Sequence, residues 1–387
     1  MTLRIDTLEL REFRGYSLLE LAGLHELNVI AGPNAVGKTN IIEGLQLLSA
    51  GQSFRKPSWS ETISWGADAA RLSARFVDEK RRVEHVLTIR GNERVYEVNG
   101  KRKSATAVAG TCPCVLFIPD DLQLVKDSSA RRRAALDDLG AQLSKNFAQL
   151  RGEYRQLLRQ RNLLIRECPE APGLLSAYND SLVACGARVC VSRWRLAARL
   201  AAHFARIYGQ LVEGERASMA YLPSWQRFDE SGNQLGDVAD ERAVPAEEVP
   251  EPAQAQEQLE RLCARLEQTE LRRRTTLVGP HKDEVAFFIN GKNARLFASQ
   301  GQQRTLVLCF KLAQVELVRE LSGQPPVLLL DDVMSELDEA HRNALTRFVE
   351  RSAQTFITTA NLGYFSDELL TKAHIIEVPL EGTRHVY

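Results

Sequence analysis

The stretch that most constrains this chain is Gly32 to Thr39, GPNAVGKT, in which two glycines frame four residues and Lys and Thr follow. This spacing is typical of a phosphate-binding loop, whose backbone N–H groups and following helix N-terminus face nucleotide phosphates. The apolar run Leu27–Ala31 before it predicts a strand, and the periodic segment Asn40–Leu48 after it predicts a helix. The alternative is a chance match on a strand–turn–helix. The loop therefore favours an α/β fold that binds ATP.

The loop assigns roles to individual residues. Lys38 is expected to reach the β- and γ-phosphates, and the Thr39 hydroxyl is expected to take a Mg²⁺ position. Arg14, in FRGY (residues 13–16), either touches the nucleotide or is an ordinary surface arginine. The residues expected to line the nucleotide in this part of the chain are Gly32, Pro33, Asn34, Ala35, Val36, Gly37, Lys38, Thr39, Asn40 and Arg14.

Far downstream, the wholly apolar run Val327–Leu330 ends in Asp331 and Asp332. Its length and composition predict a strand buried on both faces. Two carboxylates at the tip of such a strand are costly unless a positive group meets them, and a Mg²⁺ ion carrying nucleotide phosphates would do so. We assign Asp331 as a metal ligand, directly or through water.

Asp332 is assigned with Lys38 to the catalytic set, because its carboxylate can orient or deprotonate the attacking water. Aspartate is shorter than the glutamate often found at such a position, so slow hydrolysis is expected. Gln123, in a loop after an apolar run, is a further candidate for the metal or the water. The alternative is a loop glutamine without such a role.

The loop Ser299–Gln302, SQGQ, precedes an amphipathic helix expected over Gln302–Leu321. Ser299, Gly301 and Gln302 form an anion site with the helix N-terminus. One nucleotide needs only one phosphate loop, so the Ser299 loop is not needed as a second loop for the nucleotide of its own chain. The simplest arrangement that uses both loops is a homodimer. In it, the Ser299 loop of one chain caps the γ-phosphate held by Lys38 of the other. A purely structural helix cap is the alternative.

The bulk composition limits the class of protein. The chain has 387 residues, with 50 basic and 50 acidic side chains, so only the distribution of charge can indicate nucleic acid. Apolar runs are too short to span a membrane, and the N-terminus lacks a signal-peptide pattern, so a cytoplasmic location is expected. The seven cysteines are irregularly spaced, which favours reduced thiols over a metal site.

The pattern along the chain predicts one head built from both chain ends, residues 1–118 and 272–387, and a helical arm, residues 119–271. Asn99-Gly100, Gly91-Asn92 and Asn290-Gly291 predict hairpins, and the two hairpin blocks are expected to join one sheet. One helix of about 40 residues is expected after Ser129, with others over 175–211 and 256–271. Residues 231–252 are expected to form a poorly ordered acidic loop.

The arm has an uneven distribution of charge. Residues 126–166 carry ten basic and four acidic side chains, and residues 188–206 add five arginines and no acid. One interpretation of these basic residues is a solvent-exposed helix face without a binding role. The functional one is a surface that follows the phosphates of DNA, since guanidinium groups pair bidentately with phosphate.

The order of phosphate loop, helical arm, Ser299 loop, LLLDD (328–332) and SELD (335–338) resembles the ABC-type ATPase heads of the SMC class. More narrowly, the chain resembles the RecF family of bacterial recombination mediators over nearly its full length. The stretches that carry the resemblance are FRGY (13–16), GPNAVGKTNIIEG (32–44), SFR (53–55), FIPDDLQLVK (117–126), YRQLLRQRN (154–162), GPHKDE (279–284), SQGQQRTL (299–306), LLLDDVMSELD (328–338) and TFITT (355–359).

The resemblance implies an ABC/SMC-type head with an inserted all-helical arm. It implies a cytoplasmic, ATP-dependent DNA-binding protein with weak, DNA-stimulated ATPase activity. With ATP and Mg²⁺, this protein dimerises on DNA at gaps or at junctions of single-stranded and double-stranded DNA. RecR and RecO are the implied partners, and the implied roles are recombinational repair, replication-fork maintenance and the SOS response.

Three features depart from the family pattern. Asp127-Ser128-Ser129 replaces a Gly-x-Pro element, the acidic insert 229–252 is long, and Ala35 replaces a glycine common in such loops. Two other functions compete with the implied one. One is a structural clamp that binds ATP with negligible turnover, and the other is a transporter-type ATPase subunit that would need a membrane partner.

Overall fold

The computed structural model describes residues 3–167, 172–229, 233, 235–244, 248–349, 354–379 and 384–385. The chain divides into two compact units. The first comprises residues 1–122 and 314–387, and the second comprises residues 123–313. In the part of the chain that is described, none of the helices combines the length and apolar character that a bilayer crossing requires.

A parallel sheet forms the centre of the first unit and confirms that both chain ends build it. Every strand pair in it is parallel, and the second of its strands, β3, leads directly into the phosphate loop. Its order is β14 (His374–Glu377), β3 (Leu27–Ala31), β13 (Thr355–Thr359), β12 (Val327–Asp331) and β8 (Cys114–Phe117).

An antiparallel sheet, built from the first part of the chain and the late strand β15, completes the unit. The turns at Gly91-Asn92 and Asn99-Gly100 join neighbouring strands, as predicted. Burial alternates along β4, because one face packs on the core and the other meets solvent. The order is β15 (Arg384–His385), β2 (Tyr16–Ala22), β1 (Arg4–Phe13), β4 (Ala69–Val77), β5 (Arg82–Arg90), β6 (Glu93–Val98) and β7 (Lys101–Lys103).

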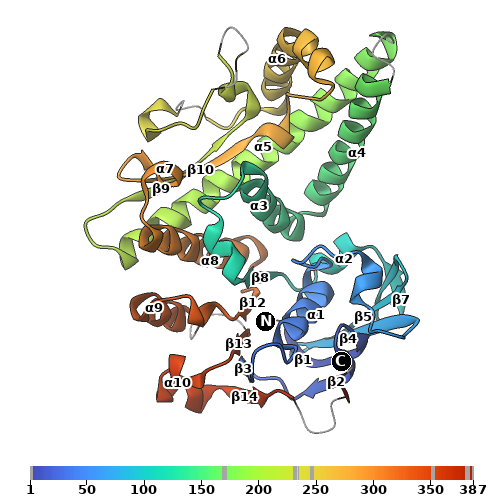
Figure 1. Ribbon diagram of the computed structural model, residues 1–387, viewed down its shortest axis with the longest axis vertical. Helices are drawn as coiled ribbons and strands as arrows, with labels where there is room; N and C mark the ends of the chain where they lie inside the picture. The colour runs from blue at the N-terminus through green and yellow to red at the C-terminus, as the bar shows by residue number, and fades with distance from the viewer. Residues whose placement is uncertain are drawn as a thin grey trace. The chain divides into compact units, whose positions relative to one another are not determined.

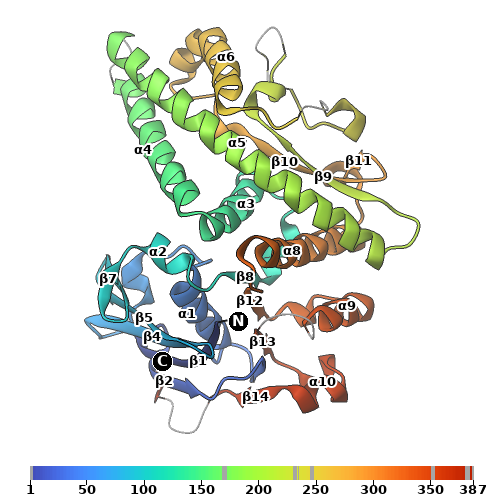
Figure 2. The same cartoon turned by 180° about the vertical axis from the view of Figure 1, so that it is seen from behind.

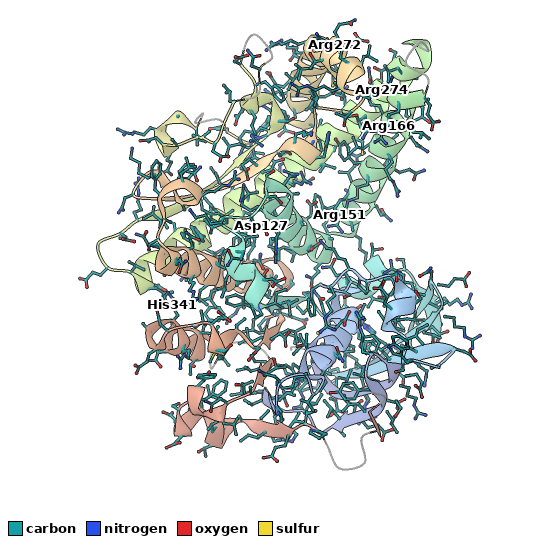
Figure 3. The ribbon with its side chains drawn as sticks, in the orientation of Figure 1. Asp127, Arg151, Arg166, Arg272, Arg274 and His341 are labelled. Atoms are coloured by element: carbon teal, nitrogen blue, oxygen red, sulfur yellow. The ribbon has the colours of Figure 1, made fainter. Side chains whose placement is uncertain are left out.

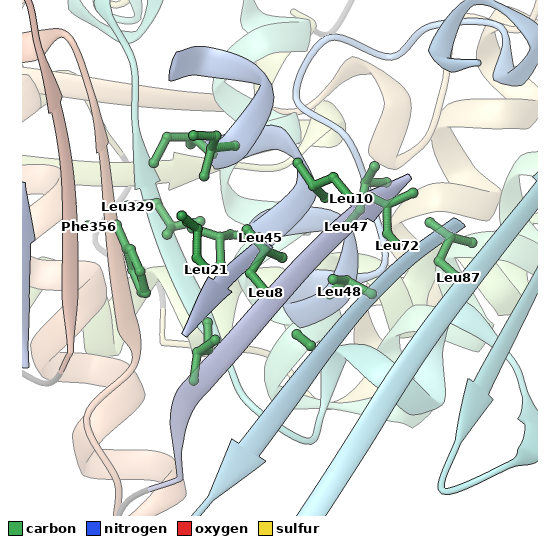
Figure 4. Close-up of a cluster of buried hydrophobic side chains, with 14 of the residues drawn as sticks. Leu8, Leu10, Leu21, Leu45, Leu47, Leu48, Leu72, Leu87, Leu329 and Phe356 are labelled. Carbon is green, nitrogen blue, oxygen red and sulfur yellow. The ribbon is translucent and has the colours of Figure 1, made fainter. Parts of the chain in front are cut away.

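Helix α1 (Lys38–Ala50) joins the two sheets through one apolar core. Leu45 and Leu48 of the helix are fully buried with Leu8 and Leu10 of β1 (Figure 4). The helix begins after Gly37 and ends at Gly51, both in the left-handed region that favours glycine. The remaining helical segments are η1 (Trp59–Thr62), α2 (Ala105–Ala109), η2 (Pro119–Gln123), η6 (Val333–Ser335), α9 (Glu339–Val349), η7 (Leu362–Tyr364) and α10 (Asp367–Lys372).

The second unit is mostly helical, but the single long helix predicted after Ser129 is two helices. Helix α3 (Ser129–Leu143) ends where Ser144 adopts an extended backbone, and the Ser144 hydroxyl accepts from Phe147 N at the start of α4 (Lys145–Glu167). A Cβ at Gly140 would lie 2.8 Å from the Phe147 ring, so glycine lets α4 fold back onto α3. Figure 2 shows α4 beside α5 (Pro172–Leu211).

A small sheet in the second unit corrects the expectation of an all-helical arm. Strand β10 (Glu284–Ile289) pairs with β9 (Ala217–Leu222) and β11 (Lys292–Asn293). The Asn290-Gly291 hairpin is therefore present, but it lies in this sheet and not in the sheet of β4–β7. Because β9 comes from within the arm, residues 272–313 group with the second unit, and the boundary lies at 313 and not at 271.

Further helices complete the second unit, as Figure 1 shows. These are η3 (Ser224–Arg227), η4 (Glu241–Ala243), α6 (Pro252–Arg273), η5 (Pro280–Lys282), α7 (Ala294–Phe297) and α8 (Gln300–Ser322), whose last turns belong to the first unit. Residues 231–232, 234 and 245–247 of the expected acidic loop lie outside the described residues. Its described part is folded locally, with Asp240 paired to Arg242 and Lys292.

Candidate nucleotide site

The phosphate loop lies at the carboxyl edge of the parallel sheet, between β3 and α1. Gly32 N donates to Thr359 O at 3.2 Å, which ties the start of the loop to β13. Ala35 and Gly37 have φ angles of 66° and 99°. A Cβ at Gly37 would lie 2.7 Å from the Tyr16 hydroxyl oxygen, so the close approach of β2 requires glycine there. This backbone path turns successive loop amides toward one concave side.

Lys38 lies within the curve of this loop and is only 6% exposed. Its Nζ donates to Gly32 O and to Pro33 O, both at 2.7 Å. Burial lowers the pKa of Lys38, while Asp332 and Asp331 oppose that change. Two carbonyl oxygens of the loop thus hold the ammonium group of Lys38. Phosphate oxygens can take the place of these carbonyl oxygens as its hydrogen-bond partners.

Asp331 connects the loop helix to β13. Thr39 Oγ1 donates to Asp331 Oδ1 at 3.1 Å, and Thr358 Oγ1 donates to the same oxygen at 2.7 Å. Burial raises the pKa of Asp331, and the two hydroxyl hydrogen bonds oppose the rise. A carboxylate and a hydroxyl at this distance are hard oxygen donors of the kind that Mg²⁺ prefers, so these residues fit such an ion.

Asp332 lies just past β12, with φ 52° in the left-handed region. Its backbone N donates to Thr358 Oγ1 at 2.9 Å. Burial raises the pKa of its carboxyl group, and Lys38 opposes that rise. Asp332 therefore lies near the ammonium group of Lys38, which is where a group acting on the terminal phosphate would be needed.

Arg14 and Arg55 converge on a buried carboxylate of α1. Arg14 donates to both Glu43 oxygens, at 3.0 and 2.8 Å, and Arg55 Nη1 donates to Glu43 Oε2 at 3.0 Å. Arg55 Nη1 also donates to Asn40 Oδ1 at 2.8 Å. The Glu43 side chain is fully buried, and this pairing places both arginines beside the first turn of α1. Whether Arg14 touches the nucleotide stays a prediction.

The Ser299 loop forms a reciprocal cap at the start of α8. Ser299 Oγ accepts from Gln302 N at 3.2 Å, and Gln302 Oε1 accepts from Ser299 N at 3.0 Å. Gln302 Nε2 also donates to Glu215 Oε1 at 3.0 Å. The structural cap is therefore present, and it leaves the Ser299 hydroxyl proton and the Gly301 amide as donors. Their role toward a second chain stays a prediction.

Gln123 ends η2, the segment that follows β8, and its side chain is exposed. Its role at the metal also stays a prediction. Sequence reasoning missed two residues of this site, Thr358 and Glu43. The two adjacent threonines at the end of the buried strand TFITT were the available signal for Thr358. The sequence contains no signal for the role of Glu43. That role depends on its contacts with Arg14 and Arg55, which only the structure shows.

Comparison with known proteins agrees with this geometry. The sequence profile described as RecF/RecN/SMC N-terminal domain matches residues 4–376. A DNA replication and repair protein RecF from Moorella thermoacetica is 34% identical over 97% of this chain and 95% of the relative. Two solved structures of the recombination mediator RecF in the RecFOR pathway are similar in fold. The one with ATPrS has a TM-score of 0.86 at 26% identity and covers 100% of this chain and 99% of that one.

The one with ATP has a TM-score of 0.81 at 28% identity and covers 95% of this chain and 93% of that one. The fold and site define an SMC-like ATPase head. The chain belongs to the RecF/RecN/SMC family and, within it, to the RecF proteins of DNA replication and repair.

Proposed function

We propose that this protein binds ATP with Mg²⁺ in the first unit and uses ATP to assemble on DNA during recombinational repair. The observation that carries the proposal is the shared contact of Thr39 and Asp331 beside Lys38. It brings together a phosphate-binding lysine, a metal-binding hydroxyl and a carboxylate from segments 292 residues apart. The solved relatives with ATPrS and with ATP support the choice of nucleotide.

Thr39 and Asp331 would hold the Mg²⁺ ion, which neutralises charge on the β- and γ-phosphates when it is bound. Lys38 would exchange its carbonyl partners for phosphate oxygens, and the loop amides would orient the phosphates. Asp332 would orient the attacking water or accept its proton. Its short side chain is consistent with weak, DNA-stimulated hydrolysis, so release from DNA would be slow.

The Ser299 loop would complete the site of a second chain in an ATP-dependent homodimer. A cap at the N-terminus of a 23-residue helix provides amide donors and a favourable dipole for the γ-phosphate. ATP would then hold the dimer together, and hydrolysis would release it. We extend the proposal to gapped DNA as the ligand, to RecR and RecO as partners, and to the cytoplasm as the location, because the solved relatives belong to the RecFOR pathway.

A clamp with negligible turnover is the second candidate. It is favoured by one observation, the placement of Asp332 in a left-handed turn with a side chain shorter than glutamate. Family membership leaves the transporter-type alternative without support.

Sedimentation velocity tests the proposal with protein alone, with ATP, and with ATP plus a gapped duplex, beside Lys38→Met. We expect ATP to double the sedimenting mass of the wild type, DNA to strengthen the effect, and Lys38→Met to remain monomeric. A wild type that stays monomeric throughout, or a Lys38→Met protein that dimerises normally, contradicts the proposal.

A further inference from the structure

Three arginines of the second unit converge on one short segment, Pro280–Asp283, within the motif GPHKDE. Arg193 of α5 donates to Pro280 O, Arg227 of η3 donates to Lys282 O, and Arg133 of α3 donates to Asp283 O. Backbone carbonyls thus fix guanidinium groups from three separate elements around Lys282. Each guanidinium has five N–H donors, so most of the donors of Arg133 and Arg227 remain for other acceptors.

Beneath this segment lies a layer of buried ion pairs, which accounts for part of the basic character of the arm. Arg132 pairs with Glu284 at 2.8 Å and Arg161 pairs with Glu270 at 2.6 Å. Arg193 pairs with Asp137 at 2.7 Å and with Asp283 at 3.3 Å. These arginines are structural, because removing one would leave a buried carboxylate without a partner. The layer contains four carboxyl groups and three arginines, and burial raises the pKa of one of the four, Asp283.

Lys282, Arg133 and Arg227 form an outer layer, here called the outer cations, which carries three positive charges. Among the residues that the structure describes, none of the three has a carboxylate within ion-pair distance. All three side chains are partly buried. Burial lowers the pKa of Lys282 and Arg133 lowers it further, while Glu270 opposes the change. Burial and Arg193 likewise lower the pKa of Arg133, while Asp283, Glu284 and Asp137 oppose that change. An anion placed among these groups would relieve their repulsion.

A second basic feature leads to this site. Arg151, Arg155, Arg159 and Arg166 are spaced by four, four and seven residues, so they share one side of α4. The same side carries Asn162, whose Oδ1 accepts from Thr276 N at 2.8 Å at the start of the loop that holds Lys282. Figure 3 labels Arg151 and Arg166 along α4, and Arg272 and Arg274 at the end of α6. Contact between Arg161 and Glu270 joins these two helices.

We propose that the outer cations bind the phosphodiester backbone of DNA, with the α4 arginines continuing the path of the strand. The arrangement suits adjacent phosphates, because backbone carbonyls of Lys282 and Asp283 hold the guanidinium groups of Arg227 and Arg133 close to the ammonium group of Lys282. It is independent of sequence, since backbone phosphates carry no base information. The proposal rests on the DNA binding included in the proposed function, and it places a contact on the motif GPHKDE.

The test is the salt dependence of binding to a gapped duplex, measured by fluorescence anisotropy between about 50 and 200 mM salt. The variants are Lys282→Gln, Lys282→Arg and the double variant Lys282→Gln with Arg227→Gln. The slope of log K against log salt should fall by about 1 for Lys282→Gln and by about 2 for the double variant. Lys282→Arg, which keeps the charge, should retain the wild-type slope.

Arg261→Gln is the matched control. Arg261 is an exposed arginine on α6 whose partner is Glu257, so its loss removes the same charge from the same unit without touching the outer cations. A wild-type slope in Lys282→Gln, or an equal fall in Arg261→Gln, overturns the proposal. Thermal unfolding of each variant reports its folding. Failure of the proposed function would be seen in a different experiment, in which the wild-type protein does not dimerise with ATP. The salt slopes instead compare variants with the wild type at one fixed nucleotide concentration, so the two failures can be distinguished.

Discussion

Thr358 Oγ1 lies 2.7 Å from Asp331 Oδ1 and donates to it, while the same hydroxyl accepts from Asp332 N. One side chain on β13 thus positions both carboxylates at the tip of the neighbouring strand. The register of the sheet explains this, since Asp331 and Thr358 are paired across β12 and β13.

Replacing Thr358 with Val removes both hydrogen bonds at nearly constant volume. The partly buried Asp332 N–H loses its partner, so stability should fall by about 1 kcal/mol. The pKa of Asp331 should rise further, and the acid limb of Mg²⁺-dependent ATP binding should therefore move to higher pH. Calorimetric titration across pH measures this. Thr359→Val is the control, because Thr359 hydrogen bonds to Asn361 instead. An unchanged acid limb in Thr358→Val would show that the hydroxyl does not tune Asp331.

Ala35 adopts a left-handed backbone in which a side chain costs about 1–2 kcal/mol. Ala35→Gly should bind ATP at least as tightly as the wild type, because glycine removes this strain. Ala35→Val should bind several-fold more weakly, since a β-branched residue is disfavoured there. Calorimetric titration with ATP measures the dissociation constants of the three proteins. Equal values for Ala35→Val and the wild type would exclude backbone strain at residue 35.

Asn tolerates the left-handed backbone of residue 332, so Asp332→Asn should leave the loop geometry intact while removing the carboxylate. If Asp332 acts on water, turnover should fall by about 100-fold or more, whereas the ATP-dependent dimer should persist or last longer. Phosphate release and sedimentation velocity on the same preparation give the two readings. Unchanged turnover would instead favour the clamp with negligible hydrolysis.

His281 is partly buried between Tyr154 and the backbone, with Nδ1 2.7 Å from the Tyr154 hydroxyl and Nε2 3.1 Å from Thr276 O. Burial lowers the pKa of His281 to about 3. Between this value and the unfolded value of about 6.5, the unfolded chain binds more protons. The stabilising contribution is therefore complete above about pH 6.5 and is lost as the pH falls toward 3.

Urea unfolding at pH 7 and pH 4 measures this contribution. Wild-type protein should lose more stability on acidification than His281→Gln. The exposed His25→Gln should behave like wild type. A wild type and His281→Gln that lose equal stability would contradict the burial of a neutral His281.

Most residues of the candidate nucleotide site could be named from the sequence because their chemistry is local. The glycine spacing around Lys38 and the acid pair after an apolar run each lie within a few residues, so both could be identified without the fold. Thr358 and Glu43 could not, because their roles come from strand register and from two arginines on other segments.

The arm was harder to predict for the same reason. A run of arginines such as residues 131–133 does not reveal which members are buried, and Arg132 and Arg133 differ in this respect although they are adjacent. The helix break at Ser144 was also missed, because it depends on the packing of Phe147 against Gly140. The pairing of β9 with β10 was missed because these strands are short and far apart in the sequence.

Strand β3, which leads into the phosphate loop, has β13 and β14 as its neighbours, and Asn28 bonds to Thr355 across 327 residues of sequence. During synthesis the loop leaves the ribosome long before these neighbours exist. A nascent chain or a truncated product therefore contains an intact GPNAVGKT but lacks the sheet that shapes it. In the proposed function, nucleotide binding would therefore require that translation has reached the last strands, and incomplete chains would not take part in the proposed ATP-dependent assembly.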